Sequence, residues 1–329
     1  MQRRKVGPFE VSALGLGCMS LSHAYGDPPD KATAGRVLLK CIELGINFFD
    51  TAAQYGFGKN EELLGEALKP HRRKIVLASK AGMFRNAAGV REVDARPELL
   101  KKTCEDALKR LQTDIIDLYY LHRWDKRIPV EVSMGAMAEL VREGKVRTLG
   151  ISEVSAATLK KAHAVHPIVA LQTEYSLWTR DAEVAVLTAC KEMGIAFVAF
   201  SPLARGFLAG GVRDVTKLPE KDIRLAMPRF EGENFQKNLK LLDEYSTIAR
   251  ENDCSMAQLA LAWVLAKGEH IVPIPGTTRL DHLEDDAGAA GVKLSAATIA
   301  RLDALINQKT VAGPRYNEAT FREIDTERA

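Results

Sequence analysis

Short apolar runs alternate along the chain with longer segments whose apolar residues recur at helical spacing. A short, continuously apolar run is typical of a parallel strand, because helices bury both faces of such a sheet. The longer segments have the pattern of amphipathic helices with one face toward the sheet. Eight runs have strand character: Leu14–Met19, Asn47–Asp50, Ile75–Lys80, Ile116–His122, Val146–Ser152, Val169–Thr173, Ala196–Ser201 and Ile271–Pro275.

Helices are expected between these strands, and several have recognisable ends. Pro97 suits a first helical turn, and Gly45, Gly144 and Gly194 suit positions just after a helix. The alternation predicts an α/β fold with a parallel sheet, and eight units favour a closed (β/α)8 TIM barrel that forms one domain over residues 1–329. The expected helices lie near Ala34–Leu44, Glu61–Leu68, Pro97–Leu111, Val132–Glu143, Ser155–Ala164, Ala182–Met193 and Met256–Ala266.

Three segments lie outside this repeat. Residues 1–13 are expected to form an N-terminal hairpin across Gly7-Pro8 that plugs the barrel bottom. Residues 203–236 form a long loop with scattered Gly, Pro, Arg and Asp, and a loop of that length within a compact domain is usually functional or mobile. Residues 308–329 are polar and are expected to form a C-terminal tail with partial order.

Ionisable side chains stand at the ends of three successive predicted strands. Asp50, Lys80 and His122 end these strands, and Tyr55 follows Asp50 on a short loop. The carboxyl ends of barrel strands meet at one face, so we expect the four side chains to converge there. The Tyr55 phenol would donate a proton, and the Lys80 ammonium would lower its pKa. Asp50 would keep Lys80 charged, and His122 would orient a carbonyl group.

Composition excludes several classes of protein. The chain has 329 residues, of which 46% are hydrophobic and 27% charged, and this is ordinary globular composition. A net charge of +3 gives no reason to expect nucleic acid binding. No apolar run reaches the ~18 residues of a membrane span, and no apolar stretch follows the basic Met1–Lys5 segment as in a secretory signal. The five cysteines are scattered, so we expect a reduced cytoplasmic protein, with Cys18 placed near the active-site mouth.

Two further patterns point away from a metal site and from a glycine-rich nucleotide loop. The seven histidines show no HxH or HxxxH spacing, so no metal is expected. Gly15-Leu16-Gly17 begins like a dinucleotide-binding motif, but Ser20 stands where the last glycine should be, and no acidic ribose-binding residue follows in a βαβ unit. We therefore expect these two glycines to allow close backbone packing around the first strand.

Short motifs follow one another in a fixed order along the chain. They are FDTA (49–52) with YG (55–56), SK (79–80), LH (121–122), GIS (150–152), LQTEY (171–175), FSPL (200–203) and IPGT (274–277). This order resembles the aldo-keto reductase superfamily. The resemblance extends from about Leu14 to Ala289 and implies a barrel enzyme with long strand-end loops. It also implies an NADPH-dependent oxidoreductase, acting on CH–OH groups, that reduces an aldehyde or ketone to an alcohol with Tyr55 as general acid. The segments 205–208 (RGFL) and 228–230 (PRF) are most similar to the long-loop bacterial, fungal and plant members, which include pyridoxal reductase-like proteins.

The resemblance implies where the nicotinamide end of the cofactor binds. Ser152, Glu153 and Gln172 match the positions that hold the carboxamide, with Glu153 where the family commonly has Asn. Glutamate cannot donate to the amide oxygen, so Ser152 or Gln172 must supply that hydrogen bond. Tyr175, or a neighbour such as Leu177, would lie under the nicotinamide ring. The loop expected to cover the pyrophosphate contains Ser201, Leu203, Arg205 and Gly206.

The other end of the cofactor would bind at the start of the last helix of the barrel. The free backbone N–H groups there form an anion site, and an arginine with threonine hydroxyls suits a 2′-phosphate, so NADPH is expected over NADH. Many relatives have Lys near Thr278 and Arg near His282, which this chain lacks. Asp285 and Asp286 match a pair that contacts adenine, with Asp replacing the usual Asn. The expected residues are Gly276, Thr277, Thr278, Arg279, His282, Asp285 and Asp286.

Bulky side chains on several strand-end loops are candidates for an apolar substrate pocket around a small-molecule carbonyl compound. Substrate specificity depends on the shape of these loops, which the sequence does not reveal. Both a monomer and a homo-oligomer are compatible with the resemblance, and no membrane or nucleic acid partner is expected. The candidate substrate-binding residues are Tyr25, Met83, Phe84, Trp124 and Trp178.

Other functions are compatible with part of this pattern. Some members of the superfamily are channel-associated subunits that bind NADPH, so the chain could be a regulatory or redox-sensing subunit with vestigial catalysis. Lys80 could also form a Schiff base, as in barrel aldolases, or only a structural ion pair with Asp50. A barrel aldolase would need no nicotinamide cofactor. Cofactor binding and turnover would separate these alternatives.

Overall fold

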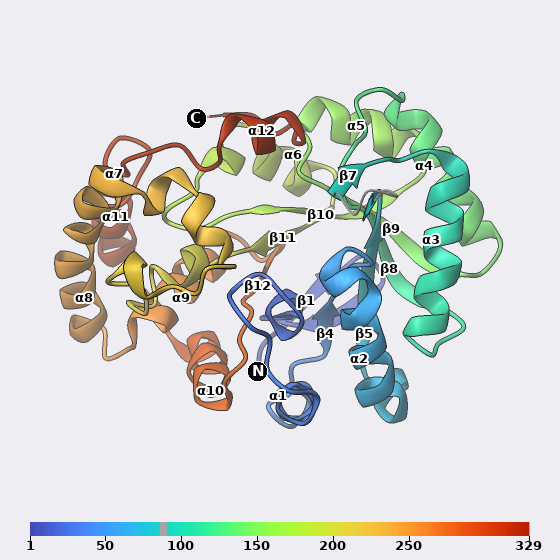
Figure 1. The fold of residues 1–329 in the computed structure, drawn as a ribbon. Coiled ribbons are helices and arrows are strands. Elements are labelled where there is room, and N and C mark those ends of the chain that lie inside the picture. The colour runs from blue at the N-terminus through green and yellow to red at the C-terminus, as the bar shows by residue number, and fades with distance from the viewer. Residues whose placement is uncertain (86–90, 329) are drawn as a thin grey trace.

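Eight parallel strands form the barrel predicted from the alternating pattern, and the fold prediction is confirmed (Figure 1). The computed structural model describes residues 1–85 and 91–328. The seam between the last and first strands is closed by hydrogen bonds from Gly15 N to Pro273 O at 3.0 Å and from Gly17 N to Pro275 O at 2.9 Å. In chain order the barrel strands are β3 (Leu16–Gly17), β4 (Phe48–Asp50), β5 (Val76–Ala81), β8 (Ile116–Leu121), β9 (Val146–Ser152), β10 (Ile168–Glu174), β11 (Ala196–Phe200) and β12 (Ile271–Ile274).

The two glycines of the partial nucleotide motif lie at this seam. A Cβ atom on Gly15 would lie 2.7 Å from Phe48 Cδ1, and one on Gly17 would lie 2.8 Å from the Ile274 carbonyl oxygen. Both distances are too short for a side chain. The expectation of close backbone packing at these glycines therefore agrees with the structure.

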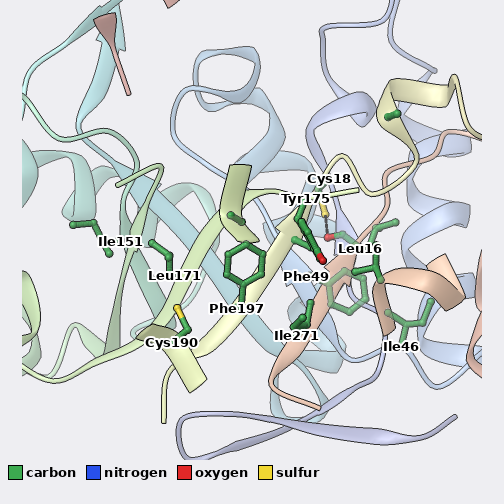
Figure 2. Close-up of a cluster of buried hydrophobic side chains, with 14 of the residues drawn as sticks. Leu16, Cys18, Ile46, Phe49, Ile151, Leu171, Tyr175, Cys190, Phe197 and Ile271 are labelled. Carbon is green, nitrogen blue, oxygen red and sulfur yellow. Dashed lines mark hydrogen bonds between the residues drawn. The ribbon is translucent and has the colours of Figure 1, made fainter. Parts of the chain in front are cut away.

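Successive residues of each strand point alternately into the barrel and toward the helices, as the strand period requires. On β4, Phe48 belongs to the cluster inside the barrel, whereas Phe49 belongs to the cluster between strands and helices. Figure 2 shows part of that outer cluster, with Leu171, Phe197 and Ile271 from three neighbouring strands. Both faces of the strands are thus buried, which explains their continuously apolar sequences.

An N-terminal hairpin closes the bottom of the barrel, as expected. Strands β1 (Arg3–Val6) and β2 (Phe9–Ser12) pair antiparallel. Their inward residues Val6 and Val11 are fully buried and join the cluster inside the barrel. Arg4 fastens the hairpin to the end of a helix, because its Nη2 donates to Leu265 O at 2.8 Å.

Helices cover the outside of the barrel. The first begins after Asp30, whose carboxylate accepts a hydrogen bond from Thr33 N, and it is followed by Gly45 with a φ of 80°. No helix in the described part of the chain is both long and apolar enough to cross a lipid bilayer. The helices are α1 (Lys31–Glu43), α2 (Lys59–Leu68), α3 (Pro97–Arg110), α4 (Val130–Arg142), α5 (Ala156–Val165), α6 (Val186–Glu192), α7 (Gly232–Leu239), α8 (Leu241–Glu251), α9 (Met256–Ala266), α10 (Leu280–Gly288), α11 (Ala296–Leu305) and α12 (Glu318–Arg322).

Some elements were not predicted. Strands β6 (Met83–Arg85) and β7 (Arg91–Val93) form an antiparallel hairpin just after β5. The long loop at 203–236 contains several short 3-10 turns and runs into α7, and α8 follows directly. These helices lie outside the strand–helix repeat, and for that reason the repeat did not predict them.

The C-terminal tail is more ordered than expected, and this corrects the prediction of partial order for residues 308–328. Near its end, Asp325 accepts hydrogen bonds from the hydroxyls of Ser155 and Thr158 at 2.9 and 2.7 Å. Glu327 accepts one from Ala156 N at 2.8 Å. These two carboxylates lie at the N-terminus of α5, where free N–H groups and the helix dipole favour negative charge.

Candidate active site

A cavity of about 1020 Å³ opens at the carboxyl ends of the barrel strands. It is at the upper limit of the usual size for a small-molecule site, which is roughly 300–1,000 Å³. Its lining includes Asp50 at the end of β4, His122 after β8, Ser152 at the end of β9 and Gln172 on β10. These strand ends give the cavity a polar floor.

The strand period explains why a lysine points into this floor. On β5, Val76 and Ala78 face the barrel interior, and Lys80 has the same phase two residues further on. Lys80 is fully buried and pairs with Asp50, and its Nζ also donates to Thr51 O at 2.8 Å. Its third close polar neighbour is the Tyr55 hydroxyl at 3.3 Å. Three of the four predicted catalytic residues, Asp50, Tyr55 and His122, therefore line the cavity, and Lys80 contacts two of them.

Burial changes the pKa values of Lys80 and Tyr55. Desolvation lowers the pKa of Lys80, but Asp50 and Tyr55 outweigh it, so the Lys80 pKa lies above its usual value. Desolvation raises the pKa of Tyr55, and the Lys80 ammonium opposes that rise only in part. Lys80 lowers the Tyr55 pKa as expected, but burial raises this pKa by more, so the net shift is upward. At neutral pH the phenol keeps its proton beside a charged lysine.

His122 lies across the cavity floor from Tyr55. The two ring centroids are 6.0 Å apart, and the rings are nearly perpendicular at 83°. Burial, aided by the charge of Arg123, lowers the pKa of His122 well below its usual value. The imidazole is therefore neutral at pH 7 and can donate one N–H hydrogen bond.

Most residues expected at the cofactor line this cavity. On the nicotinamide side these include Ser152 and Gln172, and the Gln172 side-chain nitrogen also donates to Asp50 Oδ2 at 2.7 Å. Gln172 thus links the expected carboxamide site directly to Asp50, the predicted catalytic aspartate. The other expected cofactor residues on the cavity wall are Ser201, Leu203, Arg205, Gly206, Gly276, Thr277, Thr278, Arg279, His282, Asp285 and Asp286.

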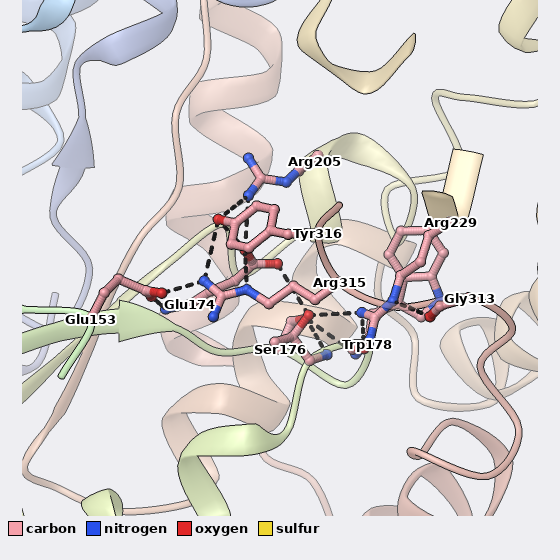
Figure 3. A network of polar contacts seen from close by, with 10 residues as sticks. Glu153, Glu174, Ser176, Trp178, Arg205, Arg229, Gly313, Arg315 and Tyr316 are labelled. Atoms are coloured by element: carbon pink, nitrogen blue, oxygen red, sulfur yellow. Dashed lines mark hydrogen bonds and ion pairs between the residues drawn. The ribbon is translucent and has the colours of Figure 1, made fainter. Parts of the chain in front are cut away.

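Glu153 was expected beside the carboxamide but lies in a buried ion network, which corrects that placement (Figure 3). Arg315 from the C-terminal tail donates to Glu153 Oε1 at 2.8 Å and to Glu174 Oε2 at 2.9 Å. Glu174 also accepts from Arg205 at 2.8 Å. Tyr316 completes the network, with its hydroxyl 3.1 Å from Glu174 Oε2. Glu153, Glu174 and Arg315 are at most 5% exposed, so their charges depend on one another.

Tyr175 was expected under the nicotinamide ring, and the structure places it elsewhere. Its ring is fully buried in the outer cluster and contacts Phe197 and Trp263, at centroid distances of 5.8 and 5.3 Å (Figure 2). Its hydroxyl donates to Glu183 at 2.7 Å. Tyr175 faces the helices because it has the outward phase of Leu171, which belongs to the same outer cluster.

The expected substrate residues divide into two groups. Tyr25 and Met83 line the cavity. Trp178 stacks on Phe207 at a centroid distance of 4.2 Å, and the Trp124 indole donates to Ile128 O at 2.8 Å. Among the residues that the structure describes, the cavity lining includes neither tryptophan nor Phe84. These three placements in the substrate pocket are therefore corrected.

Several residues of the cavity wall were not predicted from the sequence. His23 lies 5.6 Å from the Tyr55 ring, centroid to centroid, and Arg123 directly follows His122. Arg123 could have been inferred from its place next to a strand-end histidine. The tail residues Tyr316, Asn317 and Thr320 also line the cavity, and no local sequence pattern indicated this.

Part of the long loop forms a bridge over the cavity. Ile223 N donates to Ala24 O at 2.9 Å, and the Arg224 guanidinium lies 5.0 Å from the Tyr25 ring. The bridge therefore joins the loop after β11 to the loop after β3. The segment at 203–236 thus supplies part of the cavity wall, and its role as a cofactor-covering loop stays a prediction.

Cys18 is buried and does not reach the cavity within the described part of the chain. The expected place near the mouth is thus corrected, and burial raises the pKa of the Cys18 thiol well above its usual value, so the thiol is protonated at neutral pH. Among residues 1–85 and 91–328, no three His, Cys, Asp or Glu side chains lie together as metal ligands.

Comparisons with known proteins agree with this geometry. The model of the Aldo/keto reductase family matches residues 13–307. A probable aldo-keto reductase 1 from Glycine max is 44% identical over 309 residues, which cover 94% of this chain and 89% of that protein. A glycerol dehydrogenase structure from Gluconobacter oxydans has a TM-score of 0.86 at 27% identity and covers 95% of this chain and 97% of its own. An aldo-keto reductase from Klebsiella pneumoniae, solved in complex with NADPH, has a TM-score of 0.73 at 26% identity, covering 95% and 99%.

Proposed function

The chain belongs to the aldo/keto reductase family, and from this premise we propose that it reduces an aldehyde or ketone to an alcohol with NADPH. The observation that carries the proposal is Lys80, which lies fully buried between Asp50 and the Tyr55 hydroxyl at the floor of the cavity. A reduced nicotinamide supplies a hydride when it is bound. The chain must then supply a proton to the oxygen of the carbonyl group.

Tyr55 is the proton donor in this proposal. Its raised pKa keeps the phenol protonated, and the Lys80 charge stabilises the phenolate that forms as the proton leaves. His122 would donate its N–H to the same oxygen and hold the carbonyl in place, since its imidazole is neutral. Each residue thus has one role that its protonation state permits.

The cavity suits NADPH at both of its ends. Ser152 and Gln172, which line the cavity, would hold the carboxamide, whereas Glu153 lies behind the cavity wall with its Oε1 paired to Arg315. The start of α10 offers Thr277, whose hydroxyl bonds Arg279 N at 3.1 Å, and the Arg279 guanidinium for a 2′-phosphate. The NADPH-bound relative from Klebsiella pneumoniae supports this choice of cofactor.

The test is NADPH oxidation with 4-nitrobenzaldehyde, methylglyoxal and pyridoxal, together with a separate measurement of NADPH affinity. Turnover of any of these aldehydes supports the proposal. Tight NADPH binding with no turnover of the panel would instead favour the regulatory or redox-sensing subunit. If the protein binds neither NADPH nor NADH, the cofactor assignment is wrong.

A carboxylate competes for the arginine expected at the 2′-phosphate. Arg279 pairs with Asp281 at 2.5 Å, and both side chains are 62% exposed. We expect Asp281→Asn to tighten NADPH binding about 3- to 10-fold, because it frees the guanidinium for the phosphate. NADH has no such phosphate, so its affinity should change little. Fluorescence titration with both cofactors measures the effect.

Glu284→Gln is the matched control for Asp281→Asn. Glu284 lies on the same helix and pairs with Lys40, so this variant removes a similar charge without touching Arg279. It should leave the ratio of the two affinities unchanged. Equal gains for NADPH and NADH in Asp281→Asn would show that Arg279 does not bind the 2′-phosphate.

Asp286 should make stability depend on pH. It is 5% exposed, and burial beside Asp285 raises its pKa to about 8. The unfolded chain ionises near ~3.9, so the raised pKa stabilises the fold at acid pH, and this contribution is lost as the pH rises toward 8. Asp286→Asn stays neutral, so it should gain stability over the wild type by about 1.4 kcal/mol per unit between pH 5 and pH 8.

Urea unfolding of both proteins at pH 5 and pH 8 measures this gain. Asp281→Asn serves as the control, since Asp281 is an exposed neighbour on the same helix. It should not become more stable relative to the wild type as the pH rises. A constant difference between Asp286→Asn and the wild type would mean that Asp286 is ionised in the folded protein.

A further inference from the structure

One arginine in the cavity wall lacks a carboxylate partner. Five arginines line the cavity, and within the described residues only Arg123 forms no ion pair. Exposure to solvent does not explain why Arg123 has no ion-pair partner. Arg123 is half-buried, whereas Arg91 and Arg279 are exposed and still form ion pairs. The other four pairs are Arg91 with Glu323, Arg205 with Glu174, Arg224 with Asp222 and Arg279 with Asp281.

The hydrogen bonds of Arg123 leave much of its guanidinium unused. Its Nη1 donates to His122 O at 2.7 Å and to Ser152 Oγ at 3.3 Å. Its Nε is buried and has no partner among the described residues. Buried N–H groups are nearly always bonded, so an unpaired one calls for a ligand or a water. A guanidinium edge with free N–H groups matches a carboxylate in both geometry and charge.

Arg123 also lies beside the reacting groups. It follows His122 in sequence, and its bond to Ser152 Oγ spans from the end of β8 to the end of β9. Its charge contributes to the proton affinities of both Tyr55 and His122. The cofactor segments at 201–206 and 276–286 follow β11 and β12, which lie three and four strands from β8 in the barrel order. An anion on Arg123 would therefore be none of the cofactor phosphates but a group of the substrate, close to its carbonyl carbon.

We propose that the substrate carries a carboxylate next to its carbonyl group, as in 2-oxo acids, and that Arg123 binds this carboxylate. This inference rests on the proposed reductase function and names its substrate class. In the reaction, the ketone carbon accepts the hydride as the C=O π bond breaks, and the oxygen takes the Tyr55 proton. The products are a 2-hydroxy acid and NADP⁺, so electrons and protons balance.

The test compares phenylglyoxylate with its methyl ester in the wild type and in Arg123→Met. The ester is the more electrophilic ketone, so a preference for the acid must come from binding. We expect the wild type to favour the acid, and Arg123→Met to lower the acid-to-ester ratio of kcat/KM about 10- to 100-fold. Most of this change should appear in KM. Arg123→Lys keeps the positive charge but lacks the two parallel N–H donors of a guanidinium, so its acid-to-ester ratio should fall less than that of Arg123→Met.

Arg91→Met is the matched control, since it removes the same charge from the same cavity wall. Arg91 is already paired with Glu323, so the ratio should change less than about threefold. An equal fall in both variants would assign the preference to the general potential of the cavity and overturn the role of Arg123. A rise in the NADPH dissociation constant in Arg123→Met, with an unchanged ratio, would make Arg123 a cofactor residue instead.

A binding measurement covers the case in which Arg123→Met does not fold. Mandelate, a 2-hydroxy acid, should bind the wild-type complex with NADP⁺ more tightly than methyl mandelate does, and added salt should weaken the difference. Equal binding of acid and ester would refute the inference. If aldehydes and the ester are reduced without preference for the acid, only this inference fails; if no carbonyl compound is reduced, the proposed function fails as well.

Discussion

Tyr55→Phe should lower kcat by about 10²- to 10⁴-fold, the usual contribution of a positioned general acid. The variant removes the hydroxyl that lies 3.3 Å from Lys80 Nζ and leaves the ring and the Lys80–Asp50 pair in place. NADPH affinity should therefore change little. Because burial raises the pKa of Tyr55, the lost group is a protonated donor and not a phenolate. Steady-state kinetics with 4-nitrobenzaldehyde and cofactor titration measure both effects.

Tyr119→Phe is the control for this experiment. Tyr119 lies on β8 facing the outer cluster, and its buried hydroxyl has no hydrogen-bond partner among the described residues. Removing that hydroxyl should leave turnover close to that of the wild type. If Tyr55→Phe, like Tyr119→Phe, retained most of the wild-type turnover, another group would have to donate the proton. The neighbouring His23 and His122 would then be the first candidates.

Arg315→Met should destabilise the fold by about 3–5 kcal/mol, the usual cost of removing one partner from a buried ion network. Arg315 is 5% exposed and bonds both Glu153 and Glu174. Without it, Glu153 loses its counter-ion inside the protein, whereas Glu174 still pairs with Arg205. Urea unfolding gives the change in stability.

A second substitution separates buried charge from lost packing. Glu153→Gln combined with Arg315→Met removes both charges of one pair, so the double variant should be more stable than Arg315→Met alone. Arg91→Met, which breaks the more exposed pair with Glu323, should cost no more than about 1 kcal/mol. If Arg315→Met costs as little as Arg91→Met, the network does not hold the tail in place.

The barrel and the convergence of Asp50, Lys80 and His122 at one face could be predicted because both follow from local sequence. Strand period places Lys80 two residues after Ala78 and therefore inside the barrel, and strand ends bring Asp50 and His122 to the same face. The same period, applied to β10, would have placed Tyr175 outside, with Leu171. That error came from following the family resemblance and not the alternation of the strand.

The environment of Glu153 could not be predicted in the same way. A glutamate after an apolar strand signals a buried partner, but that partner, Arg315, lies 162 residues further along the chain. Neither helical nor strand periodicity relates two positions so far apart in the sequence. The polar composition of the tail gave no indication that it contacts the barrel. The tail residues of the cavity wall, including Tyr316, were missed for the same reason.

The position of Arg315 also determines when the active-site face can be completed during synthesis. A ribosome makes the chain from its N-terminus, so Glu153 emerges long before Arg315, its only ion-pair partner among the described residues. Until Arg315 leaves the ribosome, burial of the Glu153 carboxylate is unfavourable, and we expect this end of the barrel to stay hydrated. The nascent protein can pack its N-terminal hairpin and its first strands early, but we expect the pocket to be completed only once Arg315 is available. Removal of the segment that contains Arg315 should therefore disturb the active site, although the predicted catalytic residues lie far earlier in the sequence.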